Sequence, residues 1–181
     1  MARLLLLVLI LAGTATAARA QDASLQMSGP LIQSGGPSFQ VPGATFAIPA
    51  GHVFRVVWVM SQHPDSSQVN PHLGIIARFY NLHARHGVPK ENLRAAAVVN
   101  GGALMPLLTD EAYQRRFGRP NPSKALVQEL LAAGARFAVC GQTATSLGVR
   151  AEEFLPGVQV AISAMTALNV FAAEGYRLQT W

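Results

Sequence analysis

Short apolar runs alternate with segments of helical periodicity over residues 53–181, and this alternation restricts the fold more than any other feature. The runs predicted as strands are 53–60, 93–99, 136–140 and 158–162, with 176–180 as a candidate fifth strand. Strands that alternate with helices imply right-handed crossovers between parallel neighbours. The pattern therefore predicts the α/β class, as a three-layer α/β/α domain with a mainly parallel five-stranded sheet.

Local signals mark the ends of the predicted helices. The helices are expected over residues 71–86, 109–118, 122–133 and 163–174. Three of them have a capping side chain at or just before their start, namely Asn70, Thr109 and Ser163. The fourth has Pro122 at its first position. A glycine closes each of the helices over 71–86, 109–118 and 122–133, and another glycine follows the helix over 163–174, as is typical of helix C-termini.

The first twenty residues have the pattern of a secretory signal peptide. A single cation precedes an apolar run that is too short to span a bilayer, and small residues follow it. Cleavage is expected between Ala20 and Gln21, which would leave a soluble exported protein, periplasmic if the cell is bacterial. Residues 21–52 are rich in Gly and Pro and predict an extended arm. The expected organisation is a signal peptide (1–20), an arm (21–52) and one α/β domain (53–181).

Composition excludes several classes of protein. Of the 181 residues, 50% are hydrophobic and 13% are charged, which is incompatible with a natively unfolded chain. The single cysteine, Cys140, excludes an internal disulfide. Two of the fourteen cations lie in the predicted signal peptide, and the one local basic cluster (Arg115, Arg116, Arg119) has no interleaved aromatic residues. We therefore expect neither a nucleic-acid partner nor stable membrane insertion.

Candidate site residues follow the predicted strands, because ligands of parallel sheets bind at the strands' carboxyl ends. After residues 93–99 come Asn100, Gly101 and Gly102, and after 136–140 come Gly141, Gln142 and Thr143. Residues 141–146 are expected to begin a helical turn whose free amide groups favour a thiolate at Cys140. In this hypothesis the amides of Gly141 and Gln142 stabilise the sulfur, while Asn100 and Thr143 supply polar contacts. The alternative is that Cys140 is a small buried apolar residue.

Two metal sites were considered from the sequence. His72, His83 and His86 share one sector of the predicted helix, but His72 and His83 lie about 16 Å apart along it, too far to share an ion. His83 and His86 would need a third ligand from elsewhere. Met60, Met105, Met165 and Cys140 all lie at or beyond strand ends, so they could converge on Cu(I). The alternative is that these methionines fill gaps in the core, and no metal or other cofactor is assigned.

Other enzyme classes lack their motifs. The chain has no Gly-x-Ser-x-Gly sequence for a hydrolase nucleophile. The pair Gly101–Gly102 lacks the third glycine and the downstream acid of a dinucleotide site. These two glycines predict a loop with positive φ or a close approach to the backbone.

Six short motifs resemble one family in their order along the chain. They are Asn81–Ala84, Val98–Ala103, Thr109–Tyr113, Asn121–Pro122, Val139–Thr143 and Ser163–Leu168. Over residues 53–181 the chain resembles exported members of the DsrE/DsrF-like (YchN-like) family. The resemblance implies an α/β/α domain, homo-oligomeric assembly and a role in sulfur transfer. Some members carry a persulfide on a cysteine that would correspond to Cys140, and Asn100 stands where related chains often have His.

Two functions therefore remain open at this point. In the first, an exported DsrE-like protein carries sulfane sulfur or undergoes thiol redox chemistry at Cys140. Because no second thiol is present, Cys140 would exchange sulfur with a separate donor or acceptor protein. In the second, the protein is a non-catalytic oligomeric module that binds a small ligand or a partner's tail, and Cys140 is merely buried.

Overall fold

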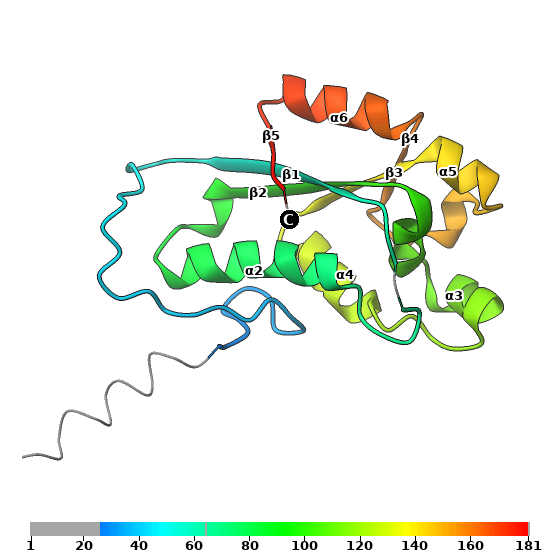
Figure 1. Cartoon of the computed structure of the whole chain (residues 1–181), viewed down its shortest axis with the longest axis horizontal. Coiled ribbons are helices and arrows are strands. Elements are labelled where there is room, and N and C mark those ends of the chain that lie inside the picture. The colour runs from blue at the N-terminus through cyan, green and yellow to red at the C-terminus, as the bar shows by residue number, and fades with distance from the viewer. Residues whose placement is uncertain (1–25, 64, 181) are drawn as a thin grey trace, which may run out of the picture.

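The computed structural model describes residues 26–63 and 65–180. Its five strands form one parallel sheet in the order β4-β3-β2-β1-β5 (Figure 1). The strands are β1 (Phe54–Met60), β2 (Leu93–Val99), β3 (Arg136–Cys140), β4 (Gln159–Ala161) and β5 (Arg177–Leu178). The predicted fold class and the five-stranded parallel sheet are confirmed.

Helices cover both faces of the sheet. They are α2 (Pro71–Arg85), α3 (Asp110–Phe117), α4 (Lys124–Ala132), α5 (Gly141–Ser146) and α6 (Ala164–Ala173), with 3₁₀ turns η1 (Lys90–Asn92), η2 (Gly101–Leu107) and η3 (Ala151–Glu153). Figure 1 shows α2 and α4 on one side of the sheet and α6 on the other. The side chains of Asn70, Thr109 and Ser163 cap α2, α3 and α6 as predicted, each by accepting a hydrogen bond from an amide in the first turn.

The structure differs from the sequence-based expectation at three places. The helix expected from Pro122 begins only at Lys124, because Asn121 Oδ1 accepts the amide of Ser123 at 2.9 Å and holds the preceding residues in a turn. The two C-terminal strands are shorter than expected, with three residues in β4 and two in β5. The 3₁₀ turn η2 was not predicted.

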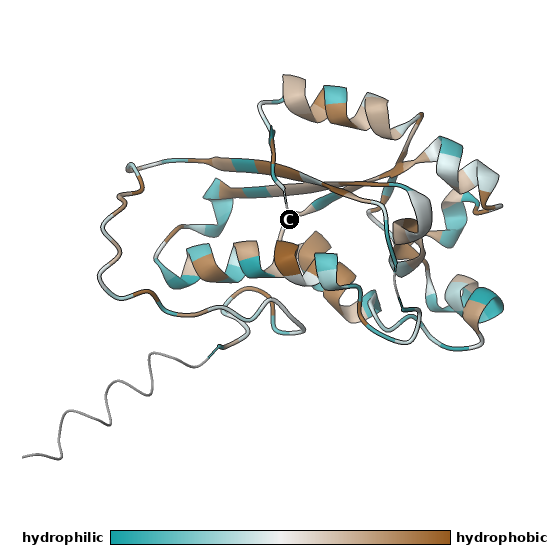
Figure 2. Cartoon of the chain, viewed as in Figure 1, coloured by the Kyte–Doolittle hydropathy of each residue, from teal (hydrophilic) through white to brown (hydrophobic). Residues whose placement is uncertain are grey.

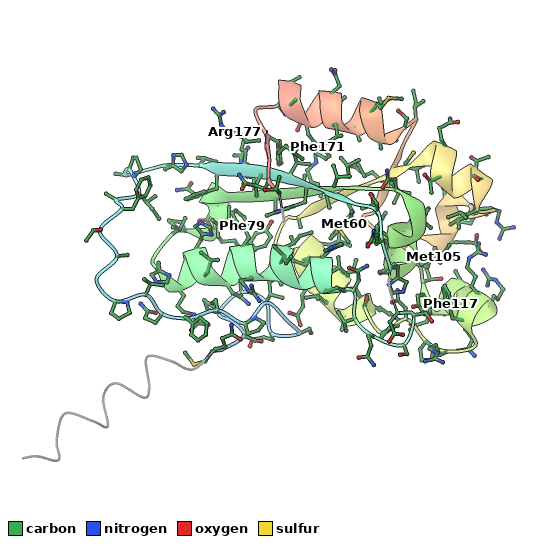
Figure 3. The ribbon with its side chains drawn as sticks, viewed as in Figure 1. Met60, Phe79, Met105, Phe117, Phe171 and Arg177 are labelled. Carbon is green, nitrogen blue, oxygen red and sulfur yellow. The ribbon has the colours of Figure 1, made fainter. Side chains whose placement is uncertain are left out.

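The two faces of the sheet carry hydrophobic cores of different size. Side chains alternate along β1, so Val56, Trp58 and Met60 enter the large core beneath α2 and α4. Val57 faces the opposite side, where α6 covers a small cluster of buried residues (Val57, Ala96, Val98, Ala138, Ala167, Phe171). Figure 3 shows Phe79 between α2 and the sheet and Phe171 between α6 and the sheet. One thin helical layer therefore covers the second face.

Residues 26–52 form an arm without regular secondary structure that runs along α2 (Figure 1). Asn81 of α2 holds it: Oδ1 accepts the amides of Leu31 and Ile32 at 3.1 and 2.8 Å. The Asn81 Nδ2 group donates to the carbonyls of Ile32, Gly35 and Gly36. This fully buried amide satisfies backbone groups that would otherwise lose their partners.

The predicted signal peptide, residues 1–20, lies outside the described residues, so its cleavage and the export of the chain remain predictions. Within residues 26–63 and 65–180, no helix combines the length and apolar character needed to cross a membrane.

Candidate functional site

Cys140 is the last residue of β3, which lies between β2 and β4. Its register partner on β4 is Ala161. By strand alternation its side chain lies on the face that carries Ala138 and α6. The residue is 7% exposed, so its sulfur is almost enclosed by protein.

The sulfur of Cys140 lies where two helices begin. The Cys140 side chain makes no capping hydrogen bond to the first turn of α5. Burial raises the pKa of the thiol, but the nearby hydroxyl of Thr143 and the nearby amides of Thr143, Ala164 and Gln142 outweigh this effect. The pKa of Cys140 is therefore lower than that of an ordinary cysteine. The donors come from the first turn of α5 and from the first residue of α6. Such donors favour the thiolate, which is the nucleophilic form.

The structure gives Gly141 a different role from the one expected. The amides that help to lower the pKa of the Cys140 thiol are those of Gln142, Thr143 and Ala164, and Gly141 is not one of these donors. A Cβ atom on Gly141 would lie 2.6 Å from the carbonyl oxygen of Ala161. Glycine at this position therefore allows β4 to approach the start of α5.

Gln142 also links α5 to the loop that leads into α6. Its Nε2 group lies 3.5 Å from the carbonyl oxygen of Ile162, at the limit of a hydrogen bond. The side chain thus connects the two segments that supply donors to Cys140.

Asn100 lies beside Cys140 at the carboxyl edge of the sheet. Val99 is the register partner of Val139, and Asn100 continues β2 with an extended backbone, so it occupies the position next to Cys140. Its backbone amide donates to the carbonyl of Met60 at 2.9 Å. Its Oδ1 atom is buried and has no hydrogen-bond partner among the described residues. The structure thus brings Asn100 and Cys140 together, but the donors that lower the pKa of the thiol belong to other residues.

The two glycines after Asn100 differ in whether a side chain could replace them. Gly101 has φ of +54°, and a Cβ atom there would lie 2.5 Å from the carbonyl oxygen of Ser61. For Gly102 the nearest atom to such a Cβ, the His63 amide nitrogen, is 3.7 Å away, an ordinary contact. The predicted positive φ and close backbone approach therefore apply to Gly101 and not to Gly102.

Sequence reasoning placed two further residues at strand ends but gave them no role. The amide of Ala164 helps to lower the pKa of Cys140, but no side-chain chemistry marks this residue. His63 Nε2 lies 2.9 Å from the hydroxyl oxygen of Tyr113, which itself donates to the carbonyl of Ser66. The Nε2 atom of His63 is therefore the donor, and burial lowers the pKa of this imidazole. Its position directly after the first predicted strand was the available signal.

The four sulfur atoms considered for Cu(I) do not converge. Met60 is fully buried in the core beneath α2 and α4 (Figure 3), and the pleat of the strands places it on the opposite face of the sheet from Cys140. Met165, in the first turn of α6, is 79% exposed. These positions favour the alternative for Met60, which fills the core.

The helical histidines bind backbone groups. His86 Nδ1 lies 2.6 Å from the carbonyl of Leu82, and its Nε2 accepts the amide of Val41 at 2.9 Å, so both ring nitrogens are occupied. His83 Nδ1 contacts the carbonyl of Phe79 at 2.7 Å. Over the described part of the chain, no group of three or more His, Cys, Asp or Glu residues could hold a metal ion.

The surface beside the site, along α6, carries no charge and exposes large apolar side chains. Ile162 and Met165 are 75% and 79% exposed, and α6 contains no charged residue. Figure 2 shows α6 mainly in the pale and brown colours of apolar residues. A pocket of about 460 Å³ borders α5 and β4, with Gly141, Ala144 and Val160 in its lining, but Cys140 does not line it.

Comparisons with known proteins agree with this architecture. The sequence model of the DsrE/DsrF-like family matches residues 55–181. A solved structure of a protein of unknown function from Methanobacterium thermoautotrophicum superposes with a TM-score of 0.52 at 24% identity, covering 70% of this chain and 97% of that one. At that identity the structural likeness shows the fold alone. No curated protein matches the chain.

Proposed function

The chain belongs to the DsrE/DsrF-like family, and on that premise we propose that it is a sulfur carrier in which Cys140 holds the transferred sulfur. The observation that supports this proposal is the place of Cys140 at the carboxyl end of β3, directly before α5, where nearby hydrogen-bond donors of Thr143, Ala164 and Gln142 lower the pKa of its thiol. A buried cysteine with a purely structural role would have a raised pKa, because burial disfavours the charged form. Here the surrounding donors reverse that effect.

The proposed reaction is thiol–persulfide exchange. The Cys140 thiolate attacks the outer sulfur of a donor persulfide, so a new S–S bond forms at Cys140 while the donor's S–S bond breaks. The donor sulfur leaves as a thiolate with the electron pair of the broken bond, and the proton of the donor persulfide stays on the transferred sulfur. The transferred sulfur keeps its oxidation state as it moves from donor to carrier, so the step needs no external oxidant.

Release would require a second protein or a small thiol. Cys140 is the only cysteine in the chain, so no internal thiol can attack the persulfide. An acceptor thiolate attacks the outer sulfur, and Cys140 departs as the thiolate that the same donors stabilise. This favours a carrier over a self-contained thiol oxidoreductase.

The proposed setting is an exported homo-oligomer. The predicted signal peptide would deliver the domain to the periplasm or to the exterior. The uncharged helix α6, with Met165 and Val170 exposed, is the surface that we assign to a second copy of the chain. Because α6 begins three residues after Ala161, the register partner of Cys140, such an interface would lie near the sulfur.

A mass measurement tests the carrier proposal. Purified protein is treated with a low-molecular-weight persulfide, freed of excess reagent and measured intact, with the Cys140→Ser variant as the matched control. The carrier should gain about 32 Da, one sulfur atom, and should lose it to an added thiol, whereas the serine variant should gain nothing.

Alkylation separates this proposal from the alternative of a non-catalytic binding module. A carrier predicts that the folded protein reacts with iodoacetamide at neutral pH faster than a model cysteine peptide. If Cys140 reacts only after unfolding and no sulfur adduct forms, the carrier proposal fails, and a binding module with a buried cysteine is the better account.

A further inference from the structure

Three neighbouring strands carry an arginine near their amino ends, on the same face of the sheet. Arg55 of β1 and Arg94 of β2 are register partners. Arg136 begins β3 opposite Ala96, two residues beyond Arg94, so strand alternation places it on that face as well. This is the face that α6 covers, and it is the opposite edge of the sheet from Cys140.

The three arginines border a pocket of about 610 Å³ between the sheet and the C-terminal end of α6. Its charged lining consists of four basic and two acidic side chains (Arg55, Lys90, Arg94, Arg136, Glu91, Glu174), which leaves positive charge in excess. Tyr176 adds an aromatic ring to the wall. The pocket is therefore both concave and cationic.

One of the arginines is held in place by its neighbours. Arg136 forms an ion pair with Glu174, and its guanidinium carbon lies 4.6 Å from the ring centre of Phe171 and 6.0 Å from that of Tyr176. These contacts fix the orientation of the guanidinium group before any ligand arrives, which reduces the entropy cost of binding.

The other two arginines remain without a carboxylate. Among the described residues, neither Arg55 nor Arg94 forms an ion pair. Adjacent strands lie about 4.8 Å apart, so two like charges in register repel each other unless an anion lies between them. Guanidinium groups bind oxyanions through paired N–H donors.

We propose that this pocket binds a small, multiply charged oxyanion, with Arg55 and Arg94 as its principal ligands and Arg136 as a preoriented third contact. The shared chemistry is that of phosphate or carboxylate groups carrying at least two negative charges. The site is separate from the sulfur chemistry: along β3, Arg136 and Cys140 are four residues apart, roughly 13 Å.

Calorimetric titration at low ionic strength tests the proposal, with pyrophosphate and citrate as probes. The variants are Arg94→Gln, the double variant Arg55→Gln/Arg94→Gln, and Arg119→Gln as a control that removes one exposed cation outside the pocket. We expect saturable binding to the natural chain, weakening of at least about tenfold in Arg94→Gln, loss in the double variant and no change in Arg119→Gln. Tighter binding of pyrophosphate than of citrate would identify a phosphate-bearing ligand, and the reverse would identify a polycarboxylate.

Circular dichroism of each variant would establish that the fold is retained. Equal affinity across all the variants, or no saturable binding to the natural chain, would overturn the proposal. The rate of Cys140 alkylation, measured on the same variants, should not change. Failure of the anion site would therefore leave the carrier proposal standing, and the reverse also holds.

Discussion

The amide of Ala164, at the amino end of α6, lies close enough to Cys140, at the carboxyl end of β3, to help lower the pKa of the Cys140 thiol. This proximity depends on strand order. Because β4 pairs beside β3, the chain that leaves β4 at Ala161 turns directly past Cys140 before α6 begins. The positive end of the helix dipole then lies at the sulfur and favours its ionised form.

The hydroxyl of Thr143 can be removed without a change in side-chain shape. In Thr143→Val the sulfur loses its only side-chain donor among those named, so the pKa of Cys140 should rise. Since a hydrogen bond to a charged group contributes about 1.5–3 kcal/mol, the alkylation rate at neutral pH should fall by roughly 10- to 150-fold. Thr143→Ser keeps the hydroxyl and should retain most of the natural rate. Equal pH–rate profiles for the valine and serine variants would contradict this role of the hydroxyl.

Gly101 and Gly102 provide a matched pair for backbone strain. Gly101→Ala places a methyl group 2.5 Å from the Ser61 carbonyl oxygen at a positive φ, whereas Gly102→Ala meets only an ordinary contact. We expect Gly101→Ala to destabilise the fold by about 2–4 kcal/mol and Gly102→Ala to have a much smaller effect. Urea unfolding of both variants measures the difference, and similar losses in the two would contradict the assigned close approach.

Asn81 attaches the arm to α2. Replacement by Ala removes the partners of the Leu31 and Ile32 amides and of three carbonyls. Unfolding free energy should fall by about 2–4 kcal/mol, and hydrogen exchange should accelerate first at residues 31 and 32. Arg78→Gln breaks a single exposed contact, to the Pro37 carbonyl, and serves as the milder control. Exchange that is unchanged at the arm in Asn81→Ala would show that other contacts hold it.

Val170 lies exposed on the uncharged helix α6, which we assign to contact with a second copy. Val170→Glu should lower the molar mass measured by light scattering to that of one chain, because a buried carboxylate without a partner is unfavourable. Ile48→Glu introduces the same charge at a comparably exposed site in the arm and should leave the mass unchanged. An unaltered assembly in Val170→Glu would place the interface elsewhere.

Local chemistry explains which parts of the fold could be predicted. The bounds of β2 and β3 agree with the predicted runs 93–99 and 136–140, because each run is apolar apart from one arginine and is followed within two residues by glycine. The capping roles of Asn70, Thr109 and Ser163 depend on neighbouring residues alone. By contrast, η2 (Gly101–Leu107) lacks a periodic apolar pattern, and tertiary packing determines its conformation.

Nonlocal relationships limited the prediction of the sites. Placement of Cys140 at a strand end follows from the alternation of strands and helices, but the donor Ala164 requires knowledge that β3 and β4 are neighbours. The arginine pocket was missed for the same reason: Arg55, Arg94 and Arg136 are far apart in the sequence and meet only through sheet register. The copper hypothesis failed because being near a strand end does not specify the face on which a side chain lies.

Half-buried histidines should make the fold sensitive to mild acid. Burial lowers the pKa of His63 and of His83, and His83 packs against Phe54 and Phe79 with ring centres 4.4 and 4.7 Å away. In the unfolded chain both titrate near the ordinary value of about 6.5. As pH falls below that value, the unfolded state binds protons before the folded state does, so the unfolding free energy should decrease from about pH 7 until the folded-state pKa values are passed.

Urea unfolding at several pH values measures this slope. His83→Phe removes one titrating group and should flatten the slope. Stability that stays constant or rises between pH 7 and pH 5 would contradict this assignment.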